Sequence, residues 1–520
     1  MKKNLTKLLC MVLCLIMLLS LAACGNSSSG NGSNGGNSGS GSQTGGDSSK
    51  RTDIIIGVAA EPPTLDIHKS GAASINENMA LCLTRLSAQQ TVEPSIAKSW
   101  TISDDGLEYV FEIDTDIKFA NGDNVTIEDV EFSLNRSWSE TGNSQYFDCL
   151  GAVDVVDDTH IKCTLSYPCA LFLTYMSDSA TSIVCKKVVE AAGDDYGINP
   201  AGSCAGPYDF VEWTPGVSVK LTANPYYAKE LAIKDVEFRF ITEASTGAIS
   251  VEAGDIDVYK NPNYIDVINL KDSSKVSIFA QSVCGFDFLG FSLINPPYDN
   301  VLVRQAIAYS FDKDELILAA IGEGGATPAA GFFPDFVFGH SDEIMTYERD
   351  PEKAKELLAQ AGYPDGLSIR ITTMDGERSK VAEYLQDTMK ESGFTVEIEN
   401  AEWSKFVDDL INGNLGAFII GVSGDVPDAD ATLYPQFRSD GGQNVHSYAN
   451  AEVDEMLLRA RQSSDSAERL ELYKEVQEIM MEELPCIPLF FKTNNMLYNS
   501  NLKNFTSNYA TDILVEYMSW

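Results

Sequence analysis

The stretch L-S-I-R-I-T-T at residues 367–373 opens a regular alternation of apolar strands and amphipathic helices. We expect a helix over residues 378–392, a strand F-T-V-E-I-E-N over 394–400, a helix over 403–412 and a strand A-F-I-I-G-V over 417–422. Strands that are separated by single helices pair in parallel through right-handed crossovers. This part of the chain therefore predicts an α/β fold with a parallel sheet.

Helix signals continue on both sides of this region. Asp350 and Pro351 are typical of a helix start, and Gly362 is typical of the end of the same helix. Three further helices are expected, over residues 299–321, 452–462 and 466–483.

The first half is less regular but contains clear strand and helix signals. Thr126, with Asp129 three residues later, predicts a capped helix start, and residues 242–253 look helical. Strands are expected over residues 53–59, 107–114, 160–166 and 234–241.

The N-terminus has the composition of a secretory signal. Lys2, Lys3 and Lys7 precede an apolar run over residues 8–20, and small residues follow directly before Cys24. The last residues of this segment resemble the lipobox of bacterial lipoproteins. The resemblance implies a signal peptide over residues 1–23, cleavage before Cys24 and lipidation of Cys24.

Residues 24–52 are expected to form a tether. Residues 25–49 are almost entirely Gly, Ser and Asn, a composition that cannot bury apolar surface and behaves as a flexible coil. About 470 residues follow, which is more than one typical domain, so we expect two lobes or more.

The chain is strongly acidic. Its formal charge of −39 becomes −42 when residues 1–23 are removed, because they contain three lysines and no acids. This charge argues against nucleic-acid binding and against adsorption to anionic lipid. Contact with the membrane is therefore expected through the lipid anchor only.

Cysteines outside the signal and the lipidation site are even in number. Five of the eight lie between residues 149 and 204, so local disulfides and, in an anaerobic habitat, reduced thiols both fit the sequence. The eight are Cys82, Cys149, Cys163, Cys169, Cys185, Cys204, Cys284 and Cys486.

Motifs of catalysis are largely absent. The four histidines form no H-E-x-x-H, and no phosphate-binding G-x-x-x-x-G-K-[ST] occurs. Residues 421–425 read G-V-S-G-D, which lacks the spacing of a nucleophile elbow. Asp425, Asp428 and Asp430 share a loop without the glycine of a calcium loop. We expect a protein that is not an enzyme, with no metal and no cofactor.

Asp425 lies just beyond the carboxyl end of the strand expected over residues 417–422. Ligands of open α/β sheets bind at that end of the strands, and a carboxylate there can hold a cationic group. The alternative is an aspartate that caps a helix or a turn.

Several runs of residues resemble one family. Residues 92–100 (V-E-P-S-I-A-K-S-W), 105–111 (D-G-L-E-Y-V-F) and 303–307 (V-R-Q-A-I) are similar to signature runs of oligopeptide- and dipeptide-binding lipoproteins of ABC importers, the family 5 extracellular solute-binding proteins. Further similar runs are Lys118-Phe119, Glu128-Asp129-Val130, Gly206-Pro207-Tyr208 and residues 485–489.

The resemblance implies a two-lobed clamshell of the periplasmic-binding-protein-like α/β fold, with an extra subdomain in the first lobe. The expected parts are a first lobe over residues 53–290, its extra subdomain over 91–199, a second lobe over 291–489 and a C-terminal return over 490–520. Ligand would bind between lobes that close by a hinge motion.

The resemblance also implies site residues. In peptide-binding members the peptide pairs with backbone that follows an L-D-x-H-K motif. That motif is residues 65–69 here, and the matching backbone is Gly71, Ala72 and Ala73. Asp425 matches the aspartate that grips the peptide's amino group.

Neighbouring positions complete the implied site. Trp403 matches an aromatic that lines a side-chain pocket, and Val422, Ser423 and Gly424 precede Asp425 in the same stretch. Val422 stands where the family has a pocket tryptophan, so the implied pocket lacks one aromatic wall that would bear on side-chain preference and peptide length.

The sequence thus predicts a monomeric receptor on the extracytoplasmic face of the membrane that captures short peptides by their extended backbone and free N-terminus and delivers them to an ABC permease. One alternative is the same fold binding a non-peptide solute such as a nickel chelate, haem, an oligosaccharide or an opine. The sequence also leaves open an extracellular peptide sensor and a hydrolase, although no nucleophile–base pair is visible.

Overall fold

The computed structural model describes residues 51–69, 73–87, 91–374, 376–423 and 426–520. The expected signal peptide, Cys24 and nearly all of the expected tether lie outside these residues, as do Gly71, Ala72, Gly424 and Asp425. Within the described part of the chain, no helix has both the length and the apolar composition of a membrane span.

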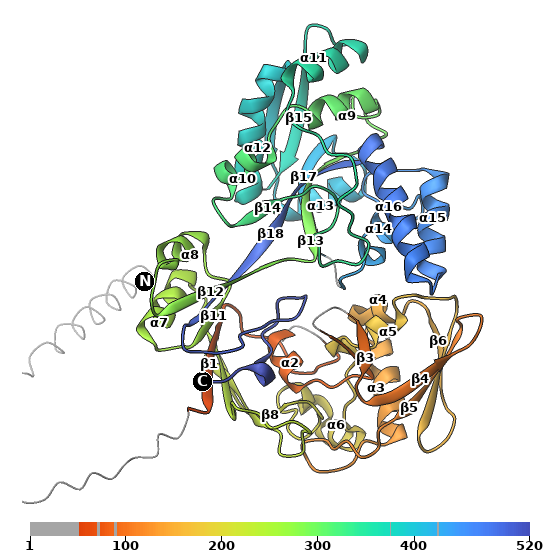
Figure 1. Cartoon of the computed structure of the whole chain (residues 1–520), viewed down its shortest axis with the longest axis vertical. Helices are drawn as coiled ribbons and strands as arrows, with labels where there is room; N and C mark the ends of the chain where they lie inside the picture. Colours follow the sequence, from red (N-terminus) through yellow and green to blue (C-terminus); the bar gives the residue numbers. More distant parts are fainter. Residues whose placement is uncertain (1–50, 70–72, 88–90, 375, 424–425) are drawn as a thin grey trace, which may run out of the picture. The chain divides into compact units, whose positions relative to one another are not determined.

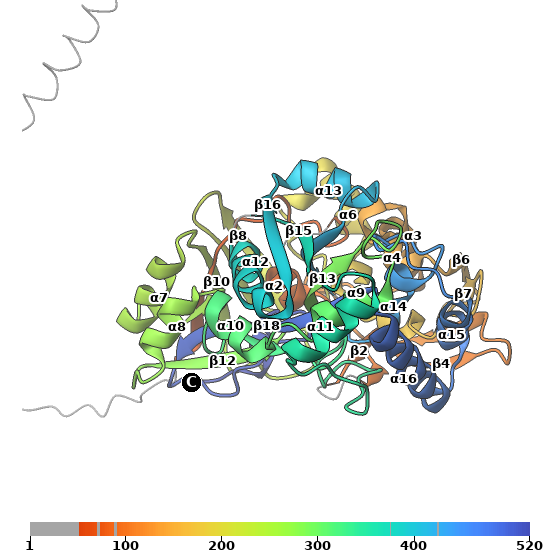
Figure 2. The same ribbon diagram turned by 90° about the horizontal axis from the view of Figure 1, so that it is seen from above.

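The predicted parallel region is confirmed. β15 (Leu367–Thr373) lies between β16 (Phe394–Asn400) and β17 (Ala417–Ser423) and runs parallel to both. The two crossovers are α12 (Glu377–Thr388) and α13 (Trp403–Ile411). α12 packs on β15 and β16 (Figure 2). Because the three strands run parallel, their carboxyl ends reach the same edge of the sheet.

β18 (Cys486–Asn499) joins two groups of strands into one mixed sheet (Figure 1). Its first part pairs antiparallel with β13 (Gly285–Phe291), which also pairs with β17, and with β14 (Ala326–Pro328). Its later part pairs with β11 (Val258–Lys260) and β12 (Val276–Ser282). The chain passes from one group to the other twice, between β12 and β13 and within β18.

The group that contains β11 is completed by four strands. β1 (Asp53–Val58) pairs in parallel with both β11 and β10 (Asp235–Phe240), and strands at β1 and β10 were expected. β9 (Ser218–Ala223) and β8 (Tyr208–Thr214) extend the sheet antiparallel.

A separate antiparallel sheet has the strand order β4–β5–β7–β6. The strands are β4 (Ala97–Ile102), β5 (Glu108–Ile113), β6 (Leu150–Val155) and β7 (His160–Leu165). α3 (Ile127–Ser139) packs on β6 and β7. The expected cap is confirmed, because the Asp129 N–H donates to the Thr126 hydroxyl and the Thr126 N–H donates to the Asp129 carboxylate.

One predicted helix is wrong. The expected continuous helix over residues 299–321 is two helices, α9 (Val301–Ala308) and α10 (Lys313–Ala320). Asp312 separates the two helices, because its carboxylate accepts the backbone N–H of Glu315 at 2.8 Å and so caps the start of α10.

The rest of the predicted helices are present with closely similar bounds. Asp350 caps α11 through the Lys353 N–H, as expected from the sequence. The remaining α-helices are α2 (Ala73–Met79), α4 (Ser144–Phe147), α5 (Phe172–Tyr175), α6 (Lys186–Ala192), α7 (Ala244–Ala253), α8 (Tyr264–Leu270), α11 (Pro351–Gln360), α14 (Asp430–Phe437), α15 (Ala451–Gln462) and α16 (Ser466–Glu483).

The buried Arg304, in the V-R-Q-A-I run at residues 303–307, connects two helices. Its guanidinium donates to the backbone carbonyls of Glu483 and Leu484 at 3.0 Å and to that of Tyr298 at 2.7 Å. Carbonyls at the end of a helix have no partner within the helix. Arg304 on α9 therefore caps the C-terminus of α16 and ties the two helices together.

All eight cysteines of the described part of the chain are buried, and none of them forms a disulfide there. Four of these residues belong to the core of the separate antiparallel sheet: Cys149, Cys163, Cys169 and Cys185. Cys204 belongs to the core that contains β1 and β8–β10.

His446 is a buried aromatic of the core rather than a polar surface group. Its ring stacks on Phe437 at a centroid distance of 5.4 Å and on Phe418 at 5.7 Å. Nδ1 lies 3.2 Å from the Phe291 carbonyl, and Nε2 has no hydrogen-bond partner among the described residues. Burial lowers the pKa of His446 to about 4.

We expect His446→Phe to reduce the sensitivity of the fold to acid. Between pH 6.5 and about pH 4 the unfolded chain binds a proton at His446 that the folded chain does not, so the free energy of unfolding falls as pH falls. The histidine accounts for about 3 kcal/mol of that loss. Urea unfolding of both proteins at about pH 7 and about pH 4.5 measures the difference.

A matched control is His160→Phe, because His160 is partly exposed beside Asp157. This variant should keep the acid response of the parent. If the His446→Phe protein lost as much stability between the two pH values as the parent does, the buried neutral imidazole would not be a source of acid sensitivity.

Candidate ligand-binding site

The carboxyl edge of β15, β16 and β17 carries two of the expected site residues. Trp403 is the first residue of α13, three positions after the end of β16, and the residue is 57% exposed. The Glu402 carboxylate caps α13 by accepting the Ser404 N–H at 2.8 Å. Val422 pairs with Phe286 near the end of β17 and is half-buried. The structure thus places Trp403 and Val422 at one edge of the sheet.

Gly424 and Asp425 lie outside the described residues, whereas Ser423 and Val426 on either side of them are described. Ser423 ends β17 opposite Gly285 of β13. Val426 is fully buried in the core of the antiparallel sheet β4–β7, and its carbonyl accepts the Cys284 thiol at 3.1 Å. Ser423 therefore belongs to the large sheet and Val426 to the other core.

Arg378 is a cation at the same edge that the sequence did not single out. It lies in the first turn of α12, after β15, and its Nε donates to the buried carboxylate of Asp287 at 2.9 Å. A Cβ at Gly421 would come within 2.8 Å of both groups, so this glycine leaves room for the pair to cross β17. About a quarter of the Arg378 side chain remains exposed.

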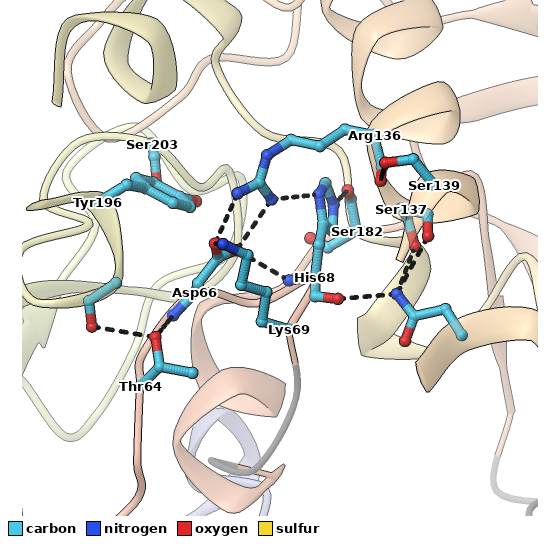
Figure 3. A network of polar contacts seen from close by, with 12 residues as sticks. Thr64, Asp66, His68, Lys69, Arg136, Ser137, Ser139, Ser182, Tyr196 and Ser203 are labelled. Carbon is cyan, nitrogen blue, oxygen red and sulfur yellow. Dashed lines mark hydrogen bonds and ion pairs between the residues drawn. The ribbon is translucent and has the colours of Figure 1, made fainter. Parts of the chain in front are cut away.

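The L-D-x-H-K segment is held by a buried ion pair (Figure 3). Arg136 on α3 donates both terminal nitrogens to the Asp66 carboxylate, at 2.8 and 2.5 Å, and lies over the Tyr196 ring at 5.3 Å. Burial acts to raise the pKa of Asp66, but the hydrogen bonds from Arg136 outweigh it and hold that pKa below its ordinary value.

His68 extends this network as a neutral imidazole. An Arg136 nitrogen lies 2.9 Å from its Nδ1, and since arginine only donates, Nδ1 accepts. Nε2 therefore carries the proton and donates to the Ser182 carbonyl at 2.8 Å. Burial lowers the pKa of His68 to about 4.

Both flanks of residues 70–72 are anchored. Before them, the Asn143 amide donates to the His68 carbonyl at 2.8 Å. After them, Ala73 begins α2, and Asn78 of α2 exchanges hydrogen bonds with the backbone of Ile513 and Val515 at 2.7 and 3.0 Å. Of the predicted backbone segment, the structure describes only the backbone of Ala73.

α2 also carries an acidic group that no sequence motif indicated. Burial, together with the carboxylates of Asp512 and Asp178, raises the pKa of Glu77 above its ordinary value. Asp512 in turn accepts the Lys260 ammonium at 2.9 Å and the Ser74 hydroxyl at 2.8 Å. Carboxylates therefore gather beside the helix that follows residues 71–72.

The acids after Asp425 are already engaged. Asp428 accepts Arg469 at 2.7 and 2.9 Å, and Asp430 accepts Arg461 at 2.9 Å. No group of three metal-binding side chains occurs among residues that the structure describes.

The sequence indicates the position of Trp403, because this residue lies between a predicted strand and a predicted helix. It does not indicate the pairing of Arg378 with Asp287, because that pairing depends on the tertiary fold.

Comparison with known proteins identifies the family. The model of bacterial extracellular solute-binding proteins, family 5 (middle) matches residues 91–444. Heme-binding protein A of Haemophilus influenzae is 30% identical over 508 residues, which cover 91% of each chain.

Two solved structures share the fold. HbpA2 from Haemophilus parasuis has a TM-score of 0.84 and 26% identity, covering 90% of this chain and 99% of that one. The ABC transporter-associated periplasmic binding protein DppA from Helicobacter pylori, in complex with the peptide STSA, has a TM-score of 0.72 and 25% identity, covering 90% and 98%. The expected α/β periplasmic-binding-protein fold is confirmed.

The signature runs, the fold and these matches agree, and the family comprises binding proteins that serve ABC importers. The chain belongs to the bacterial extracellular solute-binding proteins of family 5.

Proposed function

We propose that this protein is a lipid-anchored receptor that captures short peptides outside the cell and delivers them to an ABC permease. The anchor is the lipid on Cys24, followed by the Gly/Ser/Asn tether over residues 24–52. The cargo is held by its extended backbone and by its free N-terminus, with Asp425 on the amino group.

The observation that carries the proposal is the convergence of suitable groups at one sheet edge. An exposed aromatic, Trp403, can cover a side chain, and β17 ends at Ser423, two residues before Asp425. The partly exposed Arg378 at the same edge offers a guanidinium for a ligand carboxylate. A short peptide has a matching set of groups: an amine, a carboxylate and side chains between them.

Closure around the cargo is proposed at the two places where the chain crosses between the strand groups. The Val283 N–H donates to the Lys492 carbonyl at 3.0 Å, so the two crossing segments are bonded to each other. We propose these segments as the hinge. The first lobe then ends near Val283 and the second lobe runs from β13 to about Lys492, so both limits lie a few residues from the expected ones at 290 and 489.

A haem or other non-peptide solute is the second candidate, because the relative at 30% identity is called a heme-binding protein. Histidines are the ligands that haem iron commonly takes from proteins. His68 and His446 are both fully buried and bonded within the fold. The other two, His160 and His340, each lie within hydrogen-bond distance of an aspartate. These contacts favour the peptide proposal over this one.

A thermal-shift titration tests the proposal. The mature protein is titrated with pooled peptides of about two to eight residues and with matched N-acetylated pools, since a ligand of the folded state raises the melting temperature by mass action. Free peptides should stabilise the protein and acetylated peptides should not. Stabilisation by haem, sugars or metal chelates, with none by either peptide pool, would assign a non-peptide cargo.

A further inference from the structure

Cys149 and Cys169 bring two thiols together inside the core of the antiparallel sheet β4–β7. Cys149 directly precedes β6, and its carbonyl accepts the Ser166 N–H at 2.7 Å at the end of β7. Cys169 follows three residues later, so the returning chain passes beside Cys149. The Cys169 side chain lies beside the Cys149 thiol and, together with burial, raises the pKa of that thiol well above its ordinary value.

Both cysteines are buried in the same apolar core. Cys149 is 1% exposed and Cys169 is 6% exposed. Tyr109 of β5 lies near both sulfurs, and burial, with the charges that these two thiols would carry, raises the pKa of Tyr109 to about 12. The pair is therefore held in a fixed position by the sheet.

The neighbouring thiols of this region contact different groups. The Cys82 thiol donates to the Asp178 carbonyl at 3.1 Å, and the Asn121 amide donates to Cys185 at 3.6 Å. Cys163 belongs to the same core as the pair, where burial, together with the charge of Asp154, raises its pKa to about 12. These contacts favour Cys149 and Cys169 as the pair that joins.

We propose that Cys149 and Cys169 form a dithiol site that is oxidised to an intramolecular disulfide while the chain folds outside the cell, before the core encloses both thiols. The oxidant is a low-molecular-weight disulfide or a disulfide-donating oxidoreductase. One thiolate attacks the oxidant's disulfide and releases a thiol, and the second thiolate then displaces the other half of the oxidant. Two electrons and two protons pass to the oxidant, which leaves as two thiols.

The location of the protein and the geometry of the loop give this bond a consequence. Disulfides form and persist outside the cell, where proteins of this family act. The bond would close the loop that contains β6 and β7 and fix the turn after it. In that turn the Ala170 N–H donates to the Arg461 carbonyl of α15 at 3.0 Å. Oxidation would therefore stabilise the segment that contacts α15.

Refolding under controlled redox conditions tests the proposal. The mature protein is unfolded with reductant and denaturant, refolded in a buffer of glutathione and its disulfide, alkylated and digested without reduction. Mass spectrometry should find a Cys149–Cys169 linked peptide lighter by two hydrogen atoms than the sum of its parts. The melting temperature should lie about 2–5 °C above that of protein refolded with reductant.

Two variants separate the pair from its surroundings. Cys169→Ala should lose both the linked peptide and the rise in melting temperature, whereas Cys163→Ala, a change in the same core, should keep both. The peptide map of the parent protein is decisive without any variant. Alkylation of both Cys149 and Cys169 in correctly refolded parent protein, or a bond from either residue to a third cysteine, would overturn the proposal.

Discussion

Asp425→Asn should weaken the binding of a free peptide by about 10- to 100-fold and leave the melting temperature of the unliganded protein unchanged. An amide keeps the size of the side chain but removes the negative charge that pairs with the peptide's ammonium group. A charge-assisted hydrogen bond contributes about 1.5–3 kcal/mol, which sets the size of the effect. Isothermal calorimetry with a peptide found in the thermal-shift screen measures it.

The control for this prediction is Asp387→Asn. It removes the same charge from α12, where the Asp387 side chain is 85% exposed and pairs with Lys390. This protein should bind peptide as the parent does. If Asp425→Asn also bound with the parent's affinity, Asp425 would have no part in the site.

Arg136→Met should lower the free energy of unfolding by about 3–5 kcal/mol at neutral pH, because it leaves the Asp66 carboxylate buried without its bidentate partner. The side chain of Asp66 is 4% exposed and that of Arg136 is 17% exposed, so water replaces little of the lost interaction. Denaturant unfolding followed by circular dichroism measures the change. We expect peptide affinity to fall as well, since Arg136 fixes the segment that leads to residues 71–73.

Lys69→Met is the matched control, because the Lys69 ammonium is also near Asp66, at 3.8 Å, but its side chain is 53% exposed. An exposed pair contributes about 0–1 kcal/mol. The double change Asp66→Asn with Arg136→Met should be more stable than Arg136→Met alone, because no buried charge remains. A double variant no more stable than the single one would mean that the Arg136 side chain acts through packing alone.

The sign of the pH dependence gives a second check on this pair. The folded pKa of Asp66 is below its ordinary value, so the stability that the pair supplies is present above about pH 4 and is lost as pH falls through the folded pKa. The stability difference between parent and Arg136→Met should therefore shrink in strong acid.

Local signals were enough to predict much of the fold. β15 and β16 have the predicted bounds, and α11 begins after its predicted cap at Asp350. These local signals are the hydrophobic periodicity, the helix caps and the turn glycines. Each acts within a few residues, so each can be recognised in a single sequence. The helix expected over residues 299–321 was wrong because its apolar residues continue across Asp312, whose cap divides it.

The site could be predicted only in part, for a physical reason. Trp403 and Val422 follow or end predicted strands, so their shared edge follows from parallel pairing. The pairs Arg136–Asp66 and Arg378–Asp287 join residues that are 70 and 91 positions apart. Nothing in local spacing reports such contacts, since they exist only after the strands and helices have packed.

The most direct test of the central claim combines a change in the ligand with a change in the protein. Calorimetry would compare one short peptide, free and N-acetylated, with the parent protein and with Asp425→Asn. Acetylation should weaken binding to the parent by about tenfold or more and have little further effect on Asp425→Asn, because both changes remove the same interaction. Equal affinity of the parent for the free and acetylated peptides would contradict the proposed capture of a free N-terminus.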